Sequence, residues 1–353
     1  MKGIFRSAAI AGVAAGAVLG AGTASAAITG AGATFPRIAY ENWWRDSGLC
    51  SYQGVGSSRG IQSFIGGTVD IAGTDATLTD AQLADLTSRR GGVKPLYFPT
   101  LLGAITVPVN IPGVVGNAMR LDGRVVADIF AGAVTTWNDR KIAATNPKLK
   151  LPASPITVCV RSDGSGTSFG FSRYLTKVSP TFRSAVNFGQ TPAWKAPNLI
   201  KQPGNPGVAN CVKSNPNSIG YVDLGDALNA GLATNVTSIG RSDVIRGKRR
   251  TRYIRPSVQS ISAAGNLKTL KSDLTIDFSA SPAVGAYPIV ITTWILAYSD
   301  YSAAGRTGSL PDVKAFLNYA YGSAAQGKLP SIGFAPLPKP VVNAAKKQLA
   351  LLR

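Results

Sequence analysis

The sequence predicts an α/β protein that folds into two lobes. Its 353 residues, 45% of them hydrophobic, can fill two cores of ordinary domain size. Apolar stretches typical of β-strands run repeatedly through a turn of glycines and hydroxyl residues into a stretch with helical periodicity. This alternation of strands and helices indicates the α/β class.

The amino-terminal segment has the order of a secretory signal peptide. A short basic stretch at residues 1–6 precedes a small-residue apolar run at residues 7–22 and an Ala-x-Ala pattern that ends at Ala26. We therefore expect residues 1–26 to be a signal peptide that is cleaved after Ala26. A membrane anchor would need about 20 strongly apolar residues, and this run is short and diluted with glycine and alanine. The expected product is a soluble, exported protein.

Three predicted strand, turn and helix units carry small polar residues at the turn. The turns are Gly30-Ala31-Gly32-Ala33-Thr34-Phe35-Pro36, Gly54-Val55-Gly56-Ser57-Ser58 and Arg161-Ser162-Asp163-Gly164-Ser165-Gly166-Thr167. In the first unit, Thr34 is expected to cap a helix that Pro36 helps to start. Helix N-termini carry unpaired N–H groups and a partial positive charge, so such turns can cradle a tetrahedral oxyanion. One such turn is weak evidence, but three of them, with Arg161 close by, indicate anion binding.

The absence of histidine removes most enzyme hypotheses. Catalytic triads of the Ser-His-Asp type, Cys-His proteases and the common zinc sites all need imidazole, and the chain has none. The segment Gly56-Ser57-Ser58-Arg59-Gly60 matches the Gly-x-Ser-x-Gly nucleophile pattern. Without a base to accept the hydroxyl proton, we interpret this match as a false positive.

The chain is strongly basic, with a formal net charge of +20 and a pI near 10.1. Much of this charge lies between Arg246 and Arg255. Such a run is usually a solvated loop, and the alternative is a docking patch for an acidic partner or envelope polymer. Nucleic acid is not expected, because no nucleic-acid module signature is present and the chain is predicted to be exported.

Four ordered motifs resemble the periplasmic phosphate-binding proteins of ABC transporters. They are Gly30-Ala31-Gly32-Ala33-Thr34-Phe35-Pro36, Gly56-Ser57-Ser58, Gly66-Gly67-Thr68-Val69-Asp70-Ile71-Ala72-Gly73-Thr74-Asp75 and Arg161-Ser162-Asp163-Gly164-Ser165-Gly166-Thr167-Ser168-Phe169. The resemblance runs from about residue 28 to 231 and returns weakly at residues 287–289. It implies the two-lobed type II periplasmic-binding-protein fold, in which each lobe is a mixed sheet flanked by helices and the ligand lies in the interlobe cleft. We expect lobe I at residues 27–103 plus about 255–353, and lobe II at about 104–254.

The resemblance also implies a set of phosphate-binding residues. Those expected to hold the phosphate oxygens are Ala33, Thr34, Phe35, Ser57, Asp75, Arg161, Ser165, Gly166 and Thr167. Asp163 is expected to steady the Arg161 guanidinium. The sequence departs from the family pattern at Arg59, where a small residue is usual. Arg59 could add a second cation near the cleft or point into solvent.

Asp75 is expected to select the ligand. A carboxylate beside an anion is unfavourable unless it accepts a hydrogen bond from a proton on that anion. Phosphate carries such a proton near neutral pH and sulfate does not, so Asp75 should admit phosphate and repel sulfate. The alternative is that Asp75 only caps the helix that follows it.

The three cysteines allow at most one internal disulfide. We favour Cys159 with Cys211, because both fall in the expected lobe II, and chain entropy would then contribute roughly 4 kcal/mol. The alternative, three free buried thiols that pack as small apolar residues, stays open.

The expected function is high-affinity binding of inorganic phosphate and its delivery to an ABC permease at the inner membrane. The protein is expected to be a periplasmic monomer without catalytic activity, metal or organic cofactor, and secretion from the cell is the alternative localisation. Two alternative functions stay open. One is an exported phosphate-ester hydrolase, which would need a nucleophile and a metal cluster or general base. The other is a secreted basic protein that scavenges phosphate or adheres to acidic surfaces.

Overall fold

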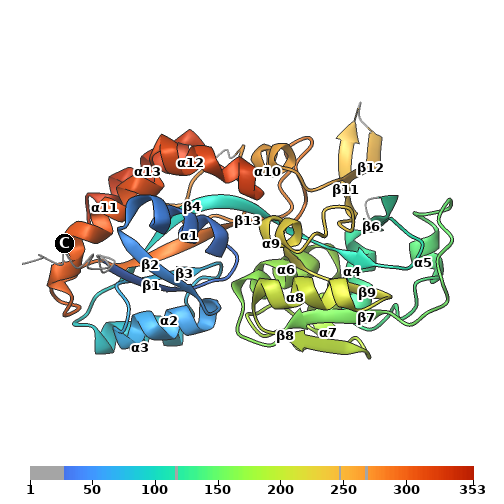
Figure 1. The fold of residues 1–353 in the computed structure, drawn as a ribbon, viewed down its shortest axis with the longest axis horizontal. Coiled ribbons are helices and arrows are strands. Elements are labelled where there is room, and N and C mark those ends of the chain that lie inside the picture. Colours follow the sequence, from blue (N-terminus) through green and yellow to red (C-terminus); the bar gives the residue numbers. More distant parts are fainter. Residues whose placement is uncertain (1–27, 116–117, 246–247, 267–268) are drawn as a thin grey trace, which may run out of the picture.

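The computed structural model describes residues 28–115, 118–245, 248–266 and 269–353. The predicted signal peptide and its cleavage point lie outside these residues. Figure 1 shows two lobes side by side, with the long strands β4 (Pro95–Thr106) and β13 (Val290–Tyr298) between the flanking helices of one lobe and extending toward the other. The mixed α/β class and the two-lobed arrangement predicted from the sequence are confirmed. The lobe boundaries near residues 103 and 254 stay a prediction.

Within the described residues the strands form three sheets, of which one fills the first lobe. Its order is β10-β4-β13-β3-β1-β2, and β14 also pairs with β4. The strands not yet given are β1 (Ile28–Gly32), β2 (Cys50–Gly54), β3 (Ile71–Thr74), β10 (Val222–Asp223) and β14 (Phe334–Ala335). β1 is parallel to β2 and β3, whereas β13 is antiparallel to β3 and β4. Every residue of β13 is buried, as expected of a central strand rich in β-branched and aromatic residues.

The other two sheets belong to the second lobe. One has the order β5-β9-β7-β8 and the other the order β12-β11-β6. Their strands are β5 (Val109–Asn110), β6 (Arg120–Asp122), β7 (Thr157–Arg161), β8 (Leu199–Gln202), β9 (Ser218–Gly220), β11 (Ser238–Ile245) and β12 (Lys248–Ile254). β7 is parallel to both β8 and β9.

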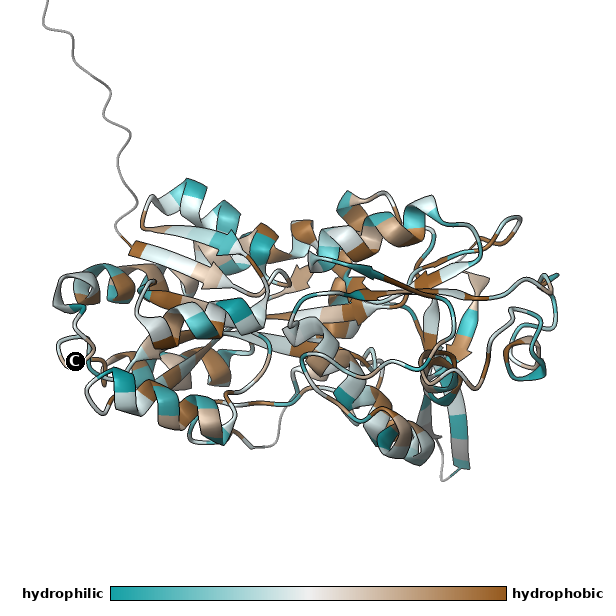
Figure 2. Cartoon of the chain, turned by 90° about the horizontal axis from the view of Figure 1, so that it is seen from below, coloured by the Kyte–Doolittle hydropathy of each residue, from teal (hydrophilic) through white to brown (hydrophobic). Residues whose placement is uncertain are grey.

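Helices cover the sheets, and Figure 2 shows that they carry alternating hydrophilic and hydrophobic bands. Before residue 95 they are α1 (Arg37–Ser47), α2 (Ser57–Gly66) and α3 (Asp80–Arg89). Between residues 123 and 229 they are α4 (Gly123–Phe130), α5 (Arg140–Ala143), α6 (Gly166–Val178), α7 (Pro180–Ala185), α8 (Gly204–Ser214) and α9 (Leu224–Asn229). After residue 254 they are α10 (Val258–Ala264), α11 (Leu310–Ala320), α12 (Ser323–Lys328) and α13 (Lys339–Leu349), with the 3-10 helices η2 (Thr307–Ser309) and η3 (Leu329–Ile332). In the described part of the chain, none of the helices combines the length and hydropathy needed to cross a bilayer.

A disulfide joins Cys159 on β7 to Cys211 on α8, the pair favoured from the sequence. The two residues lie in a small apolar cluster with Val208, Val212 and Val222. Cys50 is a free, buried thiol.

The basic segment is a β-hairpin in its described part, so the expectation of a solvated loop between Arg246 and Arg255 was wrong. β12 pairs with β11 in an antiparallel register that places Arg252 opposite Arg241 and Tyr253 opposite Gly240. Charge suggested a loop, but Thr251, Tyr253 and Ile254 favour a strand. Arg246 itself lies outside the described residues.

Candidate anion-binding site

The predicted site residues lie at the ends of strands from both lobes. Thr34, Ser57 and Asp75 follow β1, β2 and β3, which are parallel in one sheet. Arg161 ends β7 in the other lobe, and Ser165 follows it at the N-terminus of α6. Carboxyl ends of parallel strands meet at the same edge of a sheet, where open α/β folds bind ligands. The two edges face each other, and the three strand, turn and helix units predicted from the sequence form here as α1, α2 and α6.

Hydrogen bonds cross directly between the two lobes at this point. The Ser57 hydroxyl oxygen accepts from the backbone N–H of Gly166 at 3.1 Å and from that of Asp75 at 3.4 Å. A Cβ atom at Gly166 would lie 2.5 Å from the Ser57 hydroxyl oxygen and 2.6 Å from the Asp75 Cβ. Only glycine therefore permits this approach of α6 to the opposite lobe.

The site is closed to solvent. Its polar side chains expose at most 6% of their surface, and they are Thr34, Ser57, Asp75, Arg161, Ser165 and Thr167. Buried polar groups need hydrogen-bond partners, so the partners that these residues have, and those they lack, indicate what the site can bind.

The hydroxyl groups of the site are arranged as donors. Thr34 Oγ1 accepts from the backbone N–H of Asn205 at 3.2 Å, and Ser165 Oγ accepts from that of Ser168 at 3.0 Å. Ser57 Oγ accepts two N–H groups. Among the described residues, none of these three hydroxyls donates its proton to a protein acceptor. Each hydroxyl therefore has a proton to donate to an oxyanion.

Arg161 is fixed by two neighbours. Its Nε donates to Asp163 Oδ1 at 2.8 Å, one terminal nitrogen donates to Asp163 Oδ2, and the other donates to Asn205 Oδ1 at 2.8 Å. A guanidinium has five N–H groups, so two remain without a partner among the described residues. Burial opposes ionisation of Asp163, but the hydrogen bonds and charge of Arg161 outweigh burial and lower the pKa of Asp163. Asp163 is therefore paired with a charged, partly unsatisfied guanidinium.

Asp75 is a buried carboxylate with one unpaired oxygen. Its Oδ2 accepts from Thr167 Oγ1 at 3.4 Å, whereas Oδ1 has no hydrogen-bond partner among the described residues. Burial raises the pKa of Asp75 to about 7, against the opposing effects of Thr293, Arg161 and Thr167. Asp75 does not cap the following helix, because Thr79 caps α3 in a capping box with Gln82. The unpaired oxygen suits a ligand that donates a proton.

The predicted residues Ala33 and Phe35 contribute differently. The N–H of Ala33 donates to Gly73 O at 2.9 Å and its carbonyl accepts from the Tyr52 hydroxyl at 2.8 Å, so both backbone groups are used within the first lobe. The N–H of Phe35 has no partner within the described residues, and its ring is fully buried. Phe35 therefore keeps a free donor beside Thr34, whereas Ala33 does not.

The expectation that Thr34 caps the first helix was wrong. The N-cap of α1 is Pro36, without a side-chain cap hydrogen bond. The Thr34 hydroxyl instead reaches the opposite lobe and accepts from the Asn205 N–H. Sequence spacing shows which residues precede a helix, but it does not show that a second lobe offers a competing donor.

Asn205 is a site residue that the sequence analysis missed. It is fully buried near the N-terminus of α8 and contacts Thr34, Arg161 and Thr167. A signal was available, because β8 runs through Pro203 and Gly204 into α8, a fourth strand, turn and helix unit.

Arg59 is exposed at the mouth of the cleft. It lines a pocket of about 400 Å³ together with Thr34, Arg37 and Asp163. Arg37 is bound to Asp226 at 3.0 Å, whereas Arg59 makes no hydrogen bond or ion pair with the described residues. Both alternatives raised for Arg59 hold in part, because it is solvent-exposed and adds a cation near the cleft.

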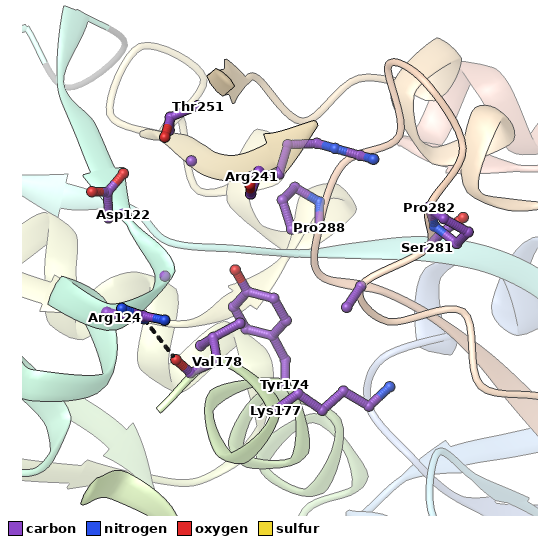
Figure 3. Close-up of a pocket in the computed structure, with 14 residues that line it drawn as sticks. Asp122, Arg124, Tyr174, Lys177, Val178, Arg241, Thr251, Ser281, Pro282 and Pro288 are labelled. Carbon is purple, nitrogen blue, oxygen red and sulfur yellow. Dashed lines mark hydrogen bonds between the residues drawn. The ribbon is translucent and has the colours of Figure 1, made fainter. Parts of the chain in front are cut away.

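A larger pocket of about 630 Å³ lies at the opposite end of α6 (Figure 3). Its cations are already bound. Lys177 pairs with Asp277 at 2.8 Å, Arg124 donates to Val178 O at 3.3 Å, and Arg241 donates to the carbonyl of Ala283 at 2.8 Å. This pocket is therefore less suited to an anion than the interlobe site.

The fold and the site define a two-lobed protein with a buried, donor-rich site between its lobes, and comparison with known proteins assigns its family. A family model described as "PBP superfamily domain" matches residues 17–324. The phosphate-binding protein PstS of Haemophilus influenzae is 32% identical over 326 residues, which cover 90% of each chain. The PstS of Methanocaldococcus jannaschii is 31% identical over 88% of this chain and 82% of its own. The chain therefore belongs to the PstS family of phosphate-binding proteins, within the PBP superfamily.

A solved structure shares the fold. The phosphate-binding protein from Stenotrophomonas maltophilia superposes with a TM-score of 0.69 at 21% identity, and the alignment covers 91% of this chain and 93% of that one. The two-lobed fold expected from the resemblance is thus confirmed by both sequence and structure.

Proposed function

We propose that this protein is an exported, non-enzymatic receptor that binds one inorganic phosphate ion between its lobes and delivers it to an ABC-type membrane permease. The relatives and the solved structure named above are phosphate-binding proteins by name. The proposed ligand residues are Ala33, Thr34, Phe35, Ser57, Asp75, Arg161, Ser165, Gly166 and Thr167. Ala33 has no free backbone donor and contributes as part of the turn that carries Thr34 and Phe35.

The observation that carries the proposal is a single buried carboxylate among donors. Thr34, Ser57 and Ser165 offer hydroxyl protons and Arg161 offers charged N–H groups, while Asp75 Oδ1 needs a donor. An unprotonated anion such as sulfate satisfies the donors but leaves Asp75 Oδ1 unpaired beside a negative charge. A protonated phosphate satisfies both, because it can donate to Asp75 while its other oxygens accept.

Binding and lobe closure are coupled in this arrangement. Half of the donors belong to each lobe, so the anion is fully coordinated only when the lobes meet. The bonds from Gly166 to Ser57 and from Asn205 to Thr34 join the two lobes in the structure described here. Phosphate therefore shifts the population toward the closed form by its differential affinity for it. A permease that recognises the closed form would then select the loaded receptor.

The phosphate-ester hydrolase is less well supported. The sequence has no histidine, and the described residues contain no group of three or more potential metal ligands among Asp, Glu, Cys and His. Asp75 accepts from Thr167 but faces no serine hydroxyl at hydrogen-bonding distance in the described residues. Hydrolysis needs an activated nucleophile or a metal-bound water, and this site supports neither.

The basic segment between Arg246 and Arg255 is proposed to dock to an acidic polymer of the cell envelope. Lys248, Arg250, Arg252 and Arg255 are exposed. The test is retention on immobilised polyglutamate. We expect retention that is lost at high salt and in a variant with Lys248, Arg250 and Arg252 changed to Gln. Retention of that variant equal to wild type would refute this role.

The protein is proposed to act as a monomer in the periplasm. Light scattering tests the oligomeric state, and cell fractionation tests the location.

Calorimetric titration of the phosphate-stripped protein tests the receptor function. We expect one phosphate per chain, no comparable heat with sulfate at pH 9, where Asp75 is ionised, and strongly weakened phosphate binding in Arg161→Gln. Arg306→Gln is the control, because Arg306 is a half-buried arginine that, like Arg161, pairs with a carboxylate, here Asp70, away from the site. No phosphate binding by the wild-type protein would overturn the proposal.

A further inference from the structure

Asn205 connects more of the site than any residue predicted from the sequence. It exposes none of its surface and is the second residue of α8. Its side chain and backbone together form four hydrogen bonds, to Arg161, Thr167, Asp223 and Thr34. Any buried asparagine needs hydrogen-bond partners for its amide. Here three of the four partners belong to the proposed phosphate site, which burial alone does not require.

The orientation of the amide is fixed by chemistry. Arginine can only donate, so the oxygen of Asn205 must face Arg161, at 2.8 Å. The amide nitrogen then faces Asp223 Oδ2 at 2.7 Å and Thr167 Oγ1 at 3.3 Å, both of which can accept. The neighbouring backbone N–H of Asp226 donates to the other oxygen of Asp223 at 2.8 Å, which holds that carboxylate in place. Asp223 thus holds the Asn205 amide in place, and Asn205 in turn bonds Arg161, Thr167 and Thr34 of the site.

The bonds of Asn205 to Arg161 and Thr34 both leave a proton for the ligand. The bond from Arg161 to Asn205 uses one terminal N–H and, with Asp163 on the other edge, fixes the plane of the guanidinium. The side-chain amide of Asn205 donates to the Thr167 hydroxyl, whose own proton goes to Asp75 Oδ2. The backbone N–H of Asn205 occupies a lone pair of the Thr34 hydroxyl, which has no protein acceptor among the described residues. A hydroxyl that already accepts a hydrogen bond is oriented to donate its own proton.

We propose that Asn205 is a positioning residue for phosphate: it orients Arg161 and the Thr34 hydroxyl toward the anion and, through Thr167, helps to hold the Asp75 carboxylate, without contacting the anion itself. Because its backbone N–H reaches Thr34 in the opposite lobe, this ordering is completed only on closure. The inference rests on the proposed phosphate function and deepens it.

A double-mutant cycle separates positioning from a merely structural role. Asn205→Ala should weaken phosphate binding about tenfold to a hundredfold, because a hydrogen bond to a charged group is lost. If Asn205 acts through Arg161, then Asn205→Ala added to Arg161→Gln should weaken binding by much less than it does in the wild-type background. Additive losses would overturn the positioning role.

Asn146→Ala provides the matched control. Asn146 is also a buried asparagine, and its amide bonds the backbone of Arg120 at 2.8 and 2.9 Å. We expect Asn146→Ala to lower the melting temperature while phosphate affinity stays at the wild-type value. Equal loss of affinity in the Asn146 and Asn205 variants would show that both act only through stability, and would overturn the inference.

Asn205→Asp supplies a second readout that does not depend on the alanine variant folding. The aspartate keeps an oxygen for Arg161 but has no N–H to donate to Asp223 Oδ2. Burial and the neighbouring Asp226 raise the pKa of Asp223, so binding should be weakest at the highest pH and recover as the pH falls and one carboxyl of the new pair gains a proton. Wild-type affinity at every pH would overturn the positioning role. If the wild-type protein itself binds no phosphate, the proposed function fails instead, so the two failures are distinguishable.

Discussion

Substituting Asp75 with asparagine should abolish the pH dependence of sulfate exclusion. Burial raises the pKa of Asp75 to about 7, and its Oδ1 lacks a partner among the described residues. Sulfate carries no proton in the neutral range, so it can be bound well only when Asp75 itself is protonated and donates. Asparagine offers an N–H donor of nearly the same shape at every pH.

The expected magnitude follows from the pKa. Well above pH 7, each pH unit reduces the protonated fraction of Asp75 about tenfold, which corresponds to about 1.4 kcal/mol of sulfate binding energy. Because about half of Asp75 is still protonated at pH 7, wild-type affinity for sulfate should fall about fivefold from pH 7 to pH 8 and about fiftyfold by pH 9. In Asp75→Asn the affinity should stay flat over this range.

Calorimetric titration with sulfate at pH 6, 7, 8 and 9 measures this difference. Asp70→Asn is the control, because Asp70 lies at the other end of β3, is also buried, and pairs with Arg306 away from the site. That variant should keep the wild-type pH profile. A sulfate affinity of the wild-type protein that does not change between pH 7 and 9 would refute the assignment of Asp75 to the anion.

Three further predictions concern stability and rate. The folded state keeps the proton of Asp75 to about pH 7, while the unfolded chain loses it near pH 4. The stability contributed by this group therefore falls as the pH rises from about 4 to 7. The free energy of unfolding, measured in urea, should decline less steeply with pH in Asp75→Asn than in the wild-type protein, and equal slopes would contradict this. In stopped-flow measurements at low salt, Arg59→Gln should slow phosphate association about twofold without changing dissociation, since one charge at about 8 Å in water contributes about 0.5 kcal/mol. Arg89→Gln, at an exposed site on α3, should leave association unchanged. Equal slowing by both variants would exclude a local effect of Arg59. Removing the Cys159–Cys211 disulfide, which spans 52 residues, should lower the free energy of unfolding by about 4 kcal/mol; an unchanged denaturant midpoint would contradict that estimate.

Much of the fold was predictable because its signals are local. The turns after β1, β2 and β7 contain glycine and hydroxyl residues between an apolar strand and an amphipathic helix, and these units form as predicted. In α2, Ile61, Phe64 and Ile65 have the spacing of one helical face, and all three are buried. Periodicity and turn chemistry act over a few residues, so a single sequence reveals them.

The parts that were missed depend on contacts between distant segments. Asn205 lies 44 residues from Arg161 and 171 from Thr34 along the chain, so its role exists only after the lobes pack. The basic hairpin was interpreted as a loop because charge dominates Lys248 to Ile254, although its pairing with β11 is regular. The unpaired oxygen and raised pKa of Asp75 likewise require burial, which no local pattern encodes.

The most direct test of the account is a crystal structure of the protein grown with phosphate. We predict one phosphate between the lobes, within hydrogen-bonding distance of the Ser57 hydroxyl, the Arg161 guanidinium and Asp75 Oδ1. Phosphate bound elsewhere, for example in the pocket of Figure 3, with the interlobe residues making no contact with it, would contradict the central claim.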